Sequence, residues 1–561
     1  MDRLKGGASP SVAQQFVPKL VTVLAEGYGR REFRADLVAG LTVAIVALPL
    51  SMAIAIASGV GPERGLYAAI VGGAIVSALG GSRFQIGGPA GAFIVLVAGC
   101  VADLGVGGLV TATCLSGLFL MAAGVFRLGA YVKFIPYPVT VGFTAAIAVI
   151  ILTSQIKDLF GLTLPGPEPG PLRDKIVALW SALGTVTPAA VGLALGTVGV
   201  IQGLKRFRPG WPGLLLAVAA AAAATAALDL QVDTIGSRFG DLPRFLPAPA
   251  LPAFGLSDLG AALPYAISFT LLGAIESLLS AVVADGMTGR RHRSNAELVA
   301  QGVANVGSAL FGGIPVTGTI ARTATNVRAA AHGPLSGMLH SGFVLLFMIV
   351  LAPLATAVPL AALAGVLAVV AWNMAEKEEF AMLVRSSAGD AAVLLATFLL
   401  VIFRDLTEGI LVGFLLGAVL FIRRMADAAE VEARAPITDQ DRADSGVPYD
   451  HATDEDILVY RIKGAFFFGA ASTVGSVLDR IADRPRAFVL DLSEVPFLDS
   501  TAAHAIELLS RKLARKQGYL YLTGTNGEIR RMLMLHGLKP PKARFADGID
   551  DALRQARLDL T

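Results

Sequence analysis

The chain has 561 residues, of which 54% are hydrophobic and 16% are charged, and its formal net charge at pH 7 is +3. Soluble globular proteins carry about 25% charged residues, so this composition excludes an ordinary water-soluble enzyme and a disordered chain. The small net charge excludes a nucleic-acid partner. The sequence therefore predicts a chain that lies mostly in a lipid bilayer.

Apolar stretches follow one another with short breaks from Leu37 to about Ile422. A membrane-crossing helix needs about 20 apolar residues, and several of these stretches are shorter. Breaks rich in Lys and Arg follow the even-numbered stretches, which places both termini in the cytoplasm. The predicted spans, about fourteen in number, are 37–58, 66–81, 90–103, 108–126, 136–156, 184–204, 211–230, 261–286, 295–312, 319–330, 334–355, 359–373, 388–404 and 406–422.

The composition predicts four parts. Residues 1–35 form a polar cytoplasmic segment, 36–425 the transmembrane domain, 426–455 a charged linker, and 456–561 a small soluble α/β domain. In the last part, alternation and apolar runs predict strands, and helical periodicity predicts helices. The strands are 457–462, 487–492 and 518–522, and the helices are 501–516 and 529–536.

The sequence offers no motif for a cofactor or for covalent chemistry. The six histidines are scattered, the phosphate-binding loop of ATPases is missing, and Cys100 and Cys114 both lie in apolar stretches. These patterns give no metal-ligand or nucleophile spacing. We therefore expect no enzyme activity and no cofactor.

Two segments rich in Gly and Pro, residues 80–93 and 311–323, interrupt the third and tenth stretches. Broken backbone is tolerated at membrane depth only where protein or a water-filled cavity covers it. Pro89 suits a first helical position, and Gly318-Thr319 suits a helix cap. Two helix N-termini that face each other would offer unpaired N–H groups to an anion. The two breaks stand seven stretches apart, which suggests two inverted repeats of about seven spans each. The alternative interpretation of both segments is that their glycines only allow close helix packing.

Two ionisable residues lie inside apolar stretches. Arg322, just inside the second break, is costly in a membrane and would attract an anion, although it could also snorkel or pair with a carboxylate. Glu276 is the one carboxylate in the middle of its span, so it must be protonated, paired or cation-bound. Its charge would repel an anion, and a proton or Na⁺ would remove that repulsion. A static Glu276–Arg322 ion pair is the alternative.

With these residues the chain resembles the sulfate permease (SulP) anion transporters, the bacterial relatives of solute carrier family 26. The matching stretches are 47–53, 61–67, 80–93, 272–289 and 312–327. The tail, with Val489-Leu490-Asp491-Leu492-Ser493 followed by Phe497-Leu498-Asp499-Ser500-Thr501, looks like a STAS domain. Residues 273–279 and 371–374 are most similar to bacterial dicarboxylate-uptake members.

The resemblance implies an α-helical polytopic membrane protein of about fourteen segments, arranged as two inverted seven-segment repeats with core and gate domains and followed by the STAS domain. It also implies a homodimer in the bacterial inner membrane. The substrate pocket of the family lies between the N-termini of segments three and ten and is closed by segment one. The corresponding substrate-binding residues here are Leu50, Ile54, Ala90, Gly91, Ala92, Phe93, Gly318, Thr319, Ile320, Ala321 and Arg322.

The resemblance also bears on the coupling ion and on the tail. Sodium-coupled bicarbonate members have an aspartate where this chain has Glu276 and a hydroxyl where it has Ser280. The glutamate here favours a proton over Na⁺, so the coupling ion is H⁺ or Na⁺, and the metal at Glu276 is either Na⁺ or none. Ala90 and Ala321 replace larger residues of animal members, which widens the pocket. In anti-sigma-factor antagonists related to STAS domains, the phosphorylated residue falls where Ser500 and Thr501 stand; docking of a cytoplasmic protein is the alternative.

We therefore expect a secondary active transporter that works by alternating access. It would couple H⁺ or Na⁺ to the uptake of sulfate, bicarbonate or a C4-dicarboxylate such as succinate or fumarate. The alternatives are an uncoupled anion channel or exchanger, a membrane-anchored STAS regulator, and a nucleobase transporter on the same architecture.

Overall fold

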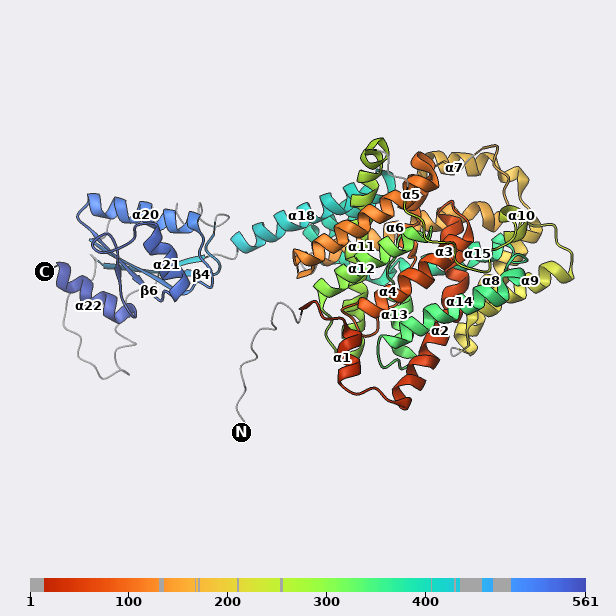
Figure 1. Ribbon diagram of the computed structural model, residues 1–561. Coiled ribbons are helices and arrows are strands. Elements are labelled where there is room, and N and C mark those ends of the chain that lie inside the picture. Colours follow the sequence, from red (N-terminus) through yellow and green to blue (C-terminus); the bar gives the residue numbers. More distant parts are fainter. Residues whose placement is uncertain are drawn as a thin grey trace. The chain divides into compact units, whose positions relative to one another are not determined.

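The chain divides into two units, Met1–Phe414 and Leu415–Thr561 (Figure 1). In this computed structural model the first unit is helical, and the second contains a sheet covered by helices. The division falls within the last predicted span, short of the expected boundary at residue 425. The described residues are 15–130, 136–166, 168–169, 172–208, 211–252, 256–404, 406–427, 430–433, 457–467 and 486–560.

The helices of the first unit follow the predicted spans in order. Among the described residues, eight helices are long and apolar enough to cross a membrane, and α9 and α17 are shorter apolar helices. The first half has α1 (Lys19–Ala25), α2 (Arg30–Ala57), α3 (Pro62–Tyr67), α4 (Gly73–Leu79), α5 (Ile94–Val125), α6 (Tyr137–Phe160), α7 (Leu172–Ser181), α8 (Pro188–Phe207), α9 (Gly213–Ala227) and α10 (Ile235–Phe239). The second half has α11 (Leu256–Thr288), α12 (Ser294–Leu310), α13 (Ile320–Arg328), α14 (Leu335–Ala355), α15 (Leu360–Met374), α16 (Lys377–Ser386), α17 (Ala388–Phe403) and α18 (Leu406–Asp427).

Two breaks in helical geometry lie where the sequence predicted the second, third and fourth spans, and the start of α2 corrects the boundary of the first span. Gly105, with φ 66°, interrupts α5 between the third and fourth predicted spans. A π-helical turn, Ala68–Gly72, joins α3 to α4 in the second. The first span begins at Arg30 rather than at residue 37, because the Glu32 carboxylate accepts a hydrogen bond from the Gly29 N–H and caps the polar first turn.

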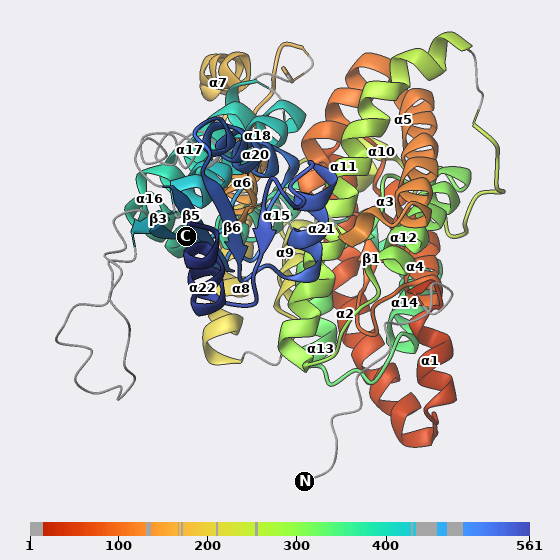
Figure 2. The same cartoon turned by 90° about the vertical axis from the view of Figure 1, so that its left-hand side faces the viewer.

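The membrane helices pack in two groups (Figure 2). In the core bundle, α5 packs against α11 and α12, and α14 packs against α2 and α4. The core bundle also includes α13, which contacts α2 and α11. In the gate bundle, α6 packs against α15 and α17, α8 packs against α9 and α15, and α16 packs against α17. Each bundle draws helices from both halves of the chain, as two intertwined repeats require.

The N-terminal strap, residues 15–29, is held against the core bundle. The Lys19 N–H donates to the Gly80 carbonyl at 2.9 Å. Arg293 donates to the Val17 carbonyl at 2.8 Å and to the Thr22 hydroxyl at 2.9 Å. An Arg83–Glu26 ion pair adds a further contact. The strap is thus fixed by residues close to the first broken segment.

The second unit contains a five-stranded sheet with the order β3-β4-β5-β6-β7. β3 is antiparallel to β4, and the other pairs are parallel. The central strand β5 has six consecutive buried residues, as a strand with helices on both faces requires. The strands are β3 (Glu430–Ala433), β4 (Ile457–Lys463), β5 (Ala487–Glu494), β6 (Tyr519–Thr523) and β7 (Arg544–Phe545), and the helices are α20 (Ser500–Arg515), α21 (Gly527–Leu535) and α22 (Ile549–Leu560).

The three strands and two helices expected in the tail are confirmed within a few residues. Within the expected linker 426–455, residues 430–433 form β3 and pair with β4. The rest of that linker from residue 434 lies outside the described residues. β7 and α22 were not expected, since β7 is two residues long and α22 is rich in charge.

Candidate functional site

The two broken segments lie side by side in the core bundle. β1 (Gly87–Gly88) pairs antiparallel with β2 (Thr317–Gly318), with Gly87 opposite Gly318 and Gly88 opposite Thr317. The Thr319 N–H continues the pairing by donating to the Ile86 carbonyl at 3.1 Å. Two chain breaks 233 residues apart are thereby joined. The prediction that both stretches are interrupted is confirmed.

Glycine is required in this pair of strands because other parts of the chain come too close for a side chain. A Cβ atom on Gly318 would lie 1.6 Å from Nε2 of Gln85, and one on Gly88 would lie 2.1 Å from Nη1 of Arg322. Gly88 also has a φ of 159°, which side chains disfavour. Close packing of glycines, offered above as the alternative interpretation, is therefore also a property of this site.

Each strand leads into a helix start whose N–H groups are free. After β1 a short 3₁₀ helix, Gly91–Phe93, opens α5, and after β2 Thr319 precedes α13. Among the described residues, the N–H groups of Ala92, Ile320 and Ala321 have no acceptor. Ala321 is exposed, so the first turn of α13 is reachable from outside the protein. Two sets of unpaired donors make this region suitable for an anion.

Pro89 and Thr319 do not play the roles that the sequence predicted in detail. Pro89 lies before the helix start and not at its first position, because the backbone stays extended through Ala90. Thr319 is the N-cap residue, but its side chain makes no capping bond. Its hydroxyl donates to the Ile86 carbonyl at 3.4 Å instead. The cap oxygen thus leaves the first N–H groups of α13 unblocked.

Arg322 is a buried cation with incomplete hydrogen bonding. Its side chain is 1% exposed, and Nη2 donates to Ser51 Oγ at 3.0 Å and to the Pro89 carbonyl at 3.3 Å. Nε and Nη1 have no partner within the described residues. No ion pair joins Arg322 to Glu276 in that part of the chain, so the static pair considered above is not formed. A buried guanidinium with two free donor atoms needs an acceptor of negative charge.

The other expected binding residues lie on α2 and at the two broken segments, which Arg322 joins through Ser51 and Pro89. Leu50 and Ile54 are buried on α2, on either side of the Ser51 that accepts from Arg322. Ala90, Ala92 and Phe93 are buried at the start of α5, whereas Gly91 is half-buried. The Phe93 ring lies 5.9 Å from the Phe269 ring of α11. The structure therefore brings α2, β1 and α13 together at Arg322.

Glu276 lies on the face of α11 that packs against the second break. Gly273 and Ser280, three and four positions away on the same face, contact that break directly. The Gly273 carbonyl accepts from Thr317 Oγ1 at 3.1 Å, and Ser280 Oγ donates to Thr323 Oγ1 at 3.0 Å. Glu276 is 8% exposed, and the described residues provide no ion pair for it. A buried acid is thus placed beside β2 and α13.

Sequence reasoning missed two polar residues of this region. Gln85 is 3% exposed, and neither atom of its amide has a partner among the described residues, although the amide lies against Gly318. Its position as a lone amide between Arg83 and Pro89 was the available signal. Glu376, half-buried with φ 40° before α16, follows Met374, whose sulfur would lie 4.0 Å from a Cβ atom on Gly91. Nothing in its polar sequence context marked it.

The expected phosphorylation positions lie at the start of α20. Ser500 and Thr501 are exposed, and the Asp499 side chain caps the helix by accepting from the Ala502 N–H at 2.9 Å. Nearby, burial raises the pKa of Asp491, but hydrogen bonds from Arg461 and Ser493 outweigh burial and hold that pKa below its usual value. The hydroxyls are accessible, and their phosphorylation stays a prediction.

Comparison with known proteins agrees with this architecture. The sulfate permease family matches residues 33–397, and the STAS domain matches 449–552. The "Putative sulfate transporter YvdB" of Bacillus subtilis is 38% identical over 94% of this chain and 98% of that protein. The "Bicarbonate transporter BicA" of Synechocystis is 31% identical over 94% and 95%.

Solved structures show the same fold. The transmembrane domain of a cyanobacterium bicarbonate transporter BicA superposes with a TM-score of 0.61 at 31% identity, covering 70% of this chain and 98% of that one. SLC26A9 superposes with a TM-score of 0.83 at 19% identity over 98% and 94%, a likeness in fold alone. The chain therefore belongs to the sulfate permease family and is a membrane-spanning anion transporter with a C-terminal STAS domain, not an enzyme.

Proposed function

We propose that this chain imports a small oxyanion across the bacterial inner membrane by alternating access, coupled to a proton on Glu276. Both termini would lie in the cytoplasm, and the working form would be a homodimer. The observation that carries the proposal is Arg322, a 1% exposed cation with free Nε and Nη1, placed where two broken helices meet. Oxyanions present several acceptor oxygens, which suits such a set of donors.

The geometry supports weak and reversible binding. A helix N-terminus contributes about 0.3–2 kcal/mol to an anion. Two N-termini and one arginine, already engaged by Ser51 and Pro89, therefore give moderate affinity. A transporter needs such affinity because the anion must leave again on the other side. Movement of the core bundle past the gate bundle would expose the site alternately.

The proposed coupling rests on the acid beside the site. An ionised Glu276 would repel the anion, so protonation would favour anion entry. Glu376, the N-cap residue of α16 in the gate bundle, is a second carboxylate, two residues after Met374, whose sulfur approaches Gly91 of the site. A second carboxylate close to Glu276 would disfavour ionisation of both. A proton is thus the proposed coupling ion. Na⁺ is the competing candidate, and if Na⁺ binds Glu276, Ser280 would be its second ligand.

The proposed substrates are sulfate and bicarbonate, because the relatives above are named for them. A C4-dicarboxylate is a third candidate, since Ala90 and Ala321 are small residues beside the two helix starts. A competition panel of these anions against one labelled substrate in proteoliposomes would rank them.

The test compares the wild type with Glu276→Gln under a pH gradient, a Na⁺ gradient and no gradient. We expect the pH gradient to accelerate uptake by the wild type, and the variant to lose at least nine-tenths of that acceleration while still binding the anion. Equal acceleration in the variant would refute the coupling role. Steady anion current without H⁺ or Na⁺ flux would instead support the channel alternative. Intact uptake after removal of residues 440–561, with loss of a signalling phenotype, would support the regulator.

A further inference from the structure

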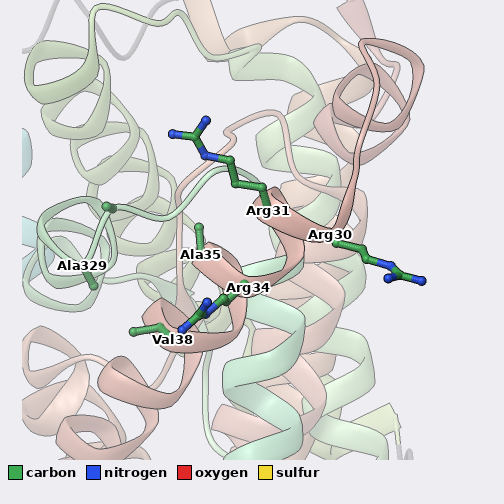
Figure 3. A pocket seen from close by; sticks show the side chains of 7 residues that line it. Arg30, Arg31, Arg34, Ala35, Val38 and Ala329 are labelled. Atoms are coloured by element: carbon green, nitrogen blue, oxygen red, sulfur yellow. The ribbon is translucent and has the colours of Figure 1, made fainter.

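A cavity of about 600 Å³ lies outside the anion site, at the first turns of α2. Its walls include Arg30, Arg31, Arg34 and Val38 of α2, together with Ala329 and Ala330 (Figure 3). The two alanines form the turn after α13, where Ala330 has a φ of 60° and the Ala331 N–H donates back to Asn326 at 3.2 Å. The cavity therefore joins the start of α2 to the end of α13.

The cavity is lined by three arginines, and Glu32 in the same turn offsets only part of their positive charge. Arg30, Arg31 and Arg34 are exposed, and none of them forms an ion pair or side-chain hydrogen bond within the described residues. They occupy the first turns of α2, where the helix end carries partial positive charge and disfavours further cations. Glu32, the acid of that turn, is engaged by the Gly29 N–H. Three cations at a helix end that already carries partial positive charge favour the binding of an anion from outside the protein.

The arginines continue into an apolar face of the same helix. Residues 31, 34, 38 and 41 are spaced by three and four positions and so share one face of α2. Val38 is 55% exposed and Leu41 is 37% exposed. In a membrane-spanning helix, an exposed apolar face meets acyl chains. From Arg34 to Leu41 the face extends about 10 Å along the helix, at 1.5 Å per residue.

A ligand of this surface must join a negative head group to an apolar chain. In Figure 3 the Arg30 side chain extends to the opposite side from those of Arg31 and Arg34, and Arg34 lies beside Val38. Arg31 and Arg34 are three positions apart on one helix face, so they are the pair that we assign to a shared ligand. We propose that the cavity binds the phosphate of an anionic phospholipid, with the acyl chain along Val38 and Leu41. Such a lipid would connect α2 to α13, the helix that begins with the anion site.

The test uses the full-length protein in detergent, titrated with phosphatidylglycerol, phosphatidylcholine or inorganic phosphate. The variant is Arg31→Gln/Arg34→Gln. The matched control is Arg206→Gln/Arg208→Gln, which removes two exposed arginines at the end of α8. Thermal unfolding and native mass spectrometry report binding. A membrane-surface arginine changes lipid affinity about fivefold, so the loss of two should weaken binding about 30-fold.

We expect phosphatidylglycerol to raise the Tm of the wild type and of the control. The glutamine pair should need about 30-fold more lipid, and Arg31→Lys/Arg34→Lys should restore most of the effect. Three results would overturn the proposal: an unchanged response in the glutamine pair, an equal loss in the control, and an equal stabilisation by inorganic phosphate or phosphatidylcholine. An unchanged response in the glutamine pair would leave Arg31 and Arg34 with a role only in the orientation of the protein in the membrane.

Discussion

Replacing Arg322 by glutamine separates a binding role from a structural one. The guanidinium has two free donor atoms, Nε and Nη1, and a third nitrogen that donates to Ser51 and Pro89. A hydrogen bond to a charged group contributes about 1.5–3 kcal/mol. Loss of one such bond to the anion should therefore raise the apparent KM about 10- to 100-fold.

The same substitution should not weaken the fold. A buried cation without a carboxylate partner is costly, and its replacement by a neutral group is often neutral or stabilising. We expect the Tm of Arg322→Gln without anion to equal or exceed that of the wild type. The rise in Tm that the substrate anion gives the wild type should disappear. The assays are uptake kinetics in proteoliposomes and thermal unfolding with and without anion.

Arg64 provides the matched control. Its Nη1 donates to the Gly312 carbonyl at 2.7 Å, so this arginine supports the second break from within the protein. Arg64→Gln should lower the Tm and leave the KM nearly unchanged. The reasoning is wrong if Arg322→Gln behaves like this control, or if its KM stays within threefold of the wild-type value.

Further substitutions test the other parts of the site and the tail. Glu376→Gln should shift the pH at which uptake is half-maximal while keeping uptake itself, because it removes a second carboxylate from the gate-bundle side of the site; an unchanged pH profile would exclude a role of Glu376 in the proposed coupling. Gly318→Ala should reduce uptake at least tenfold, since its Cβ would meet the buried Gln85 side chain at 1.6 Å, whereas Gly342→Ala, with no atom within 4 Å, should be tolerated; equal uptake by both would argue against the close approach.

The STAS domain offers a prediction on pH. The lowered pKa of Asp491 means that its contribution to stability is complete above its usual value of 3.8 and is lost as the pH falls through the folded-state pKa. Asp491→Asn should therefore destabilise the second unit by about 1.5–3 kcal/mol at pH 7 and less in acid. Hydrogen exchange of β5 in the full-length protein measures this, and equal protection in both proteins at pH 7 would contradict it.

The sequence predicted the membrane-spanning helices and their order, because these depend on long apolar runs. Even the division of α5 at Gly105 and the shortness of α13 follow from the spacing of glycines and prolines. Elements without a long apolar run escaped notice. They include the polar start of α2, the amphipathic helices α7 and α16, and strand β3, which pairs with the distant strand β4.

Within the site, the sequence identified residues whose charge is costly to bury in a membrane. It did not identify residues whose role depends only on where the fold places them. Arg322 and Glu276 were recognisable because charge inside an apolar run needs an explanation. Glu376 lies in a polar stretch, and only the approach of the preceding Met374 to Gly91 in the structure brings it to notice. Gln85 became notable only after the structure placed its unpartnered amide against Gly318.

The N-terminal strap has a practical consequence for following motion. Because Lys19, Thr22 and Glu26 are held by residues 80, 83 and 293, this segment must travel with the helices that carry the first broken strand. Leu24, within the strap, is 55% exposed and so accepts a spectroscopic probe without disturbing buried contacts. A spin label there, paired with one on α17, would measure the displacement of the core bundle relative to the gate bundle that the proposed alternating access requires.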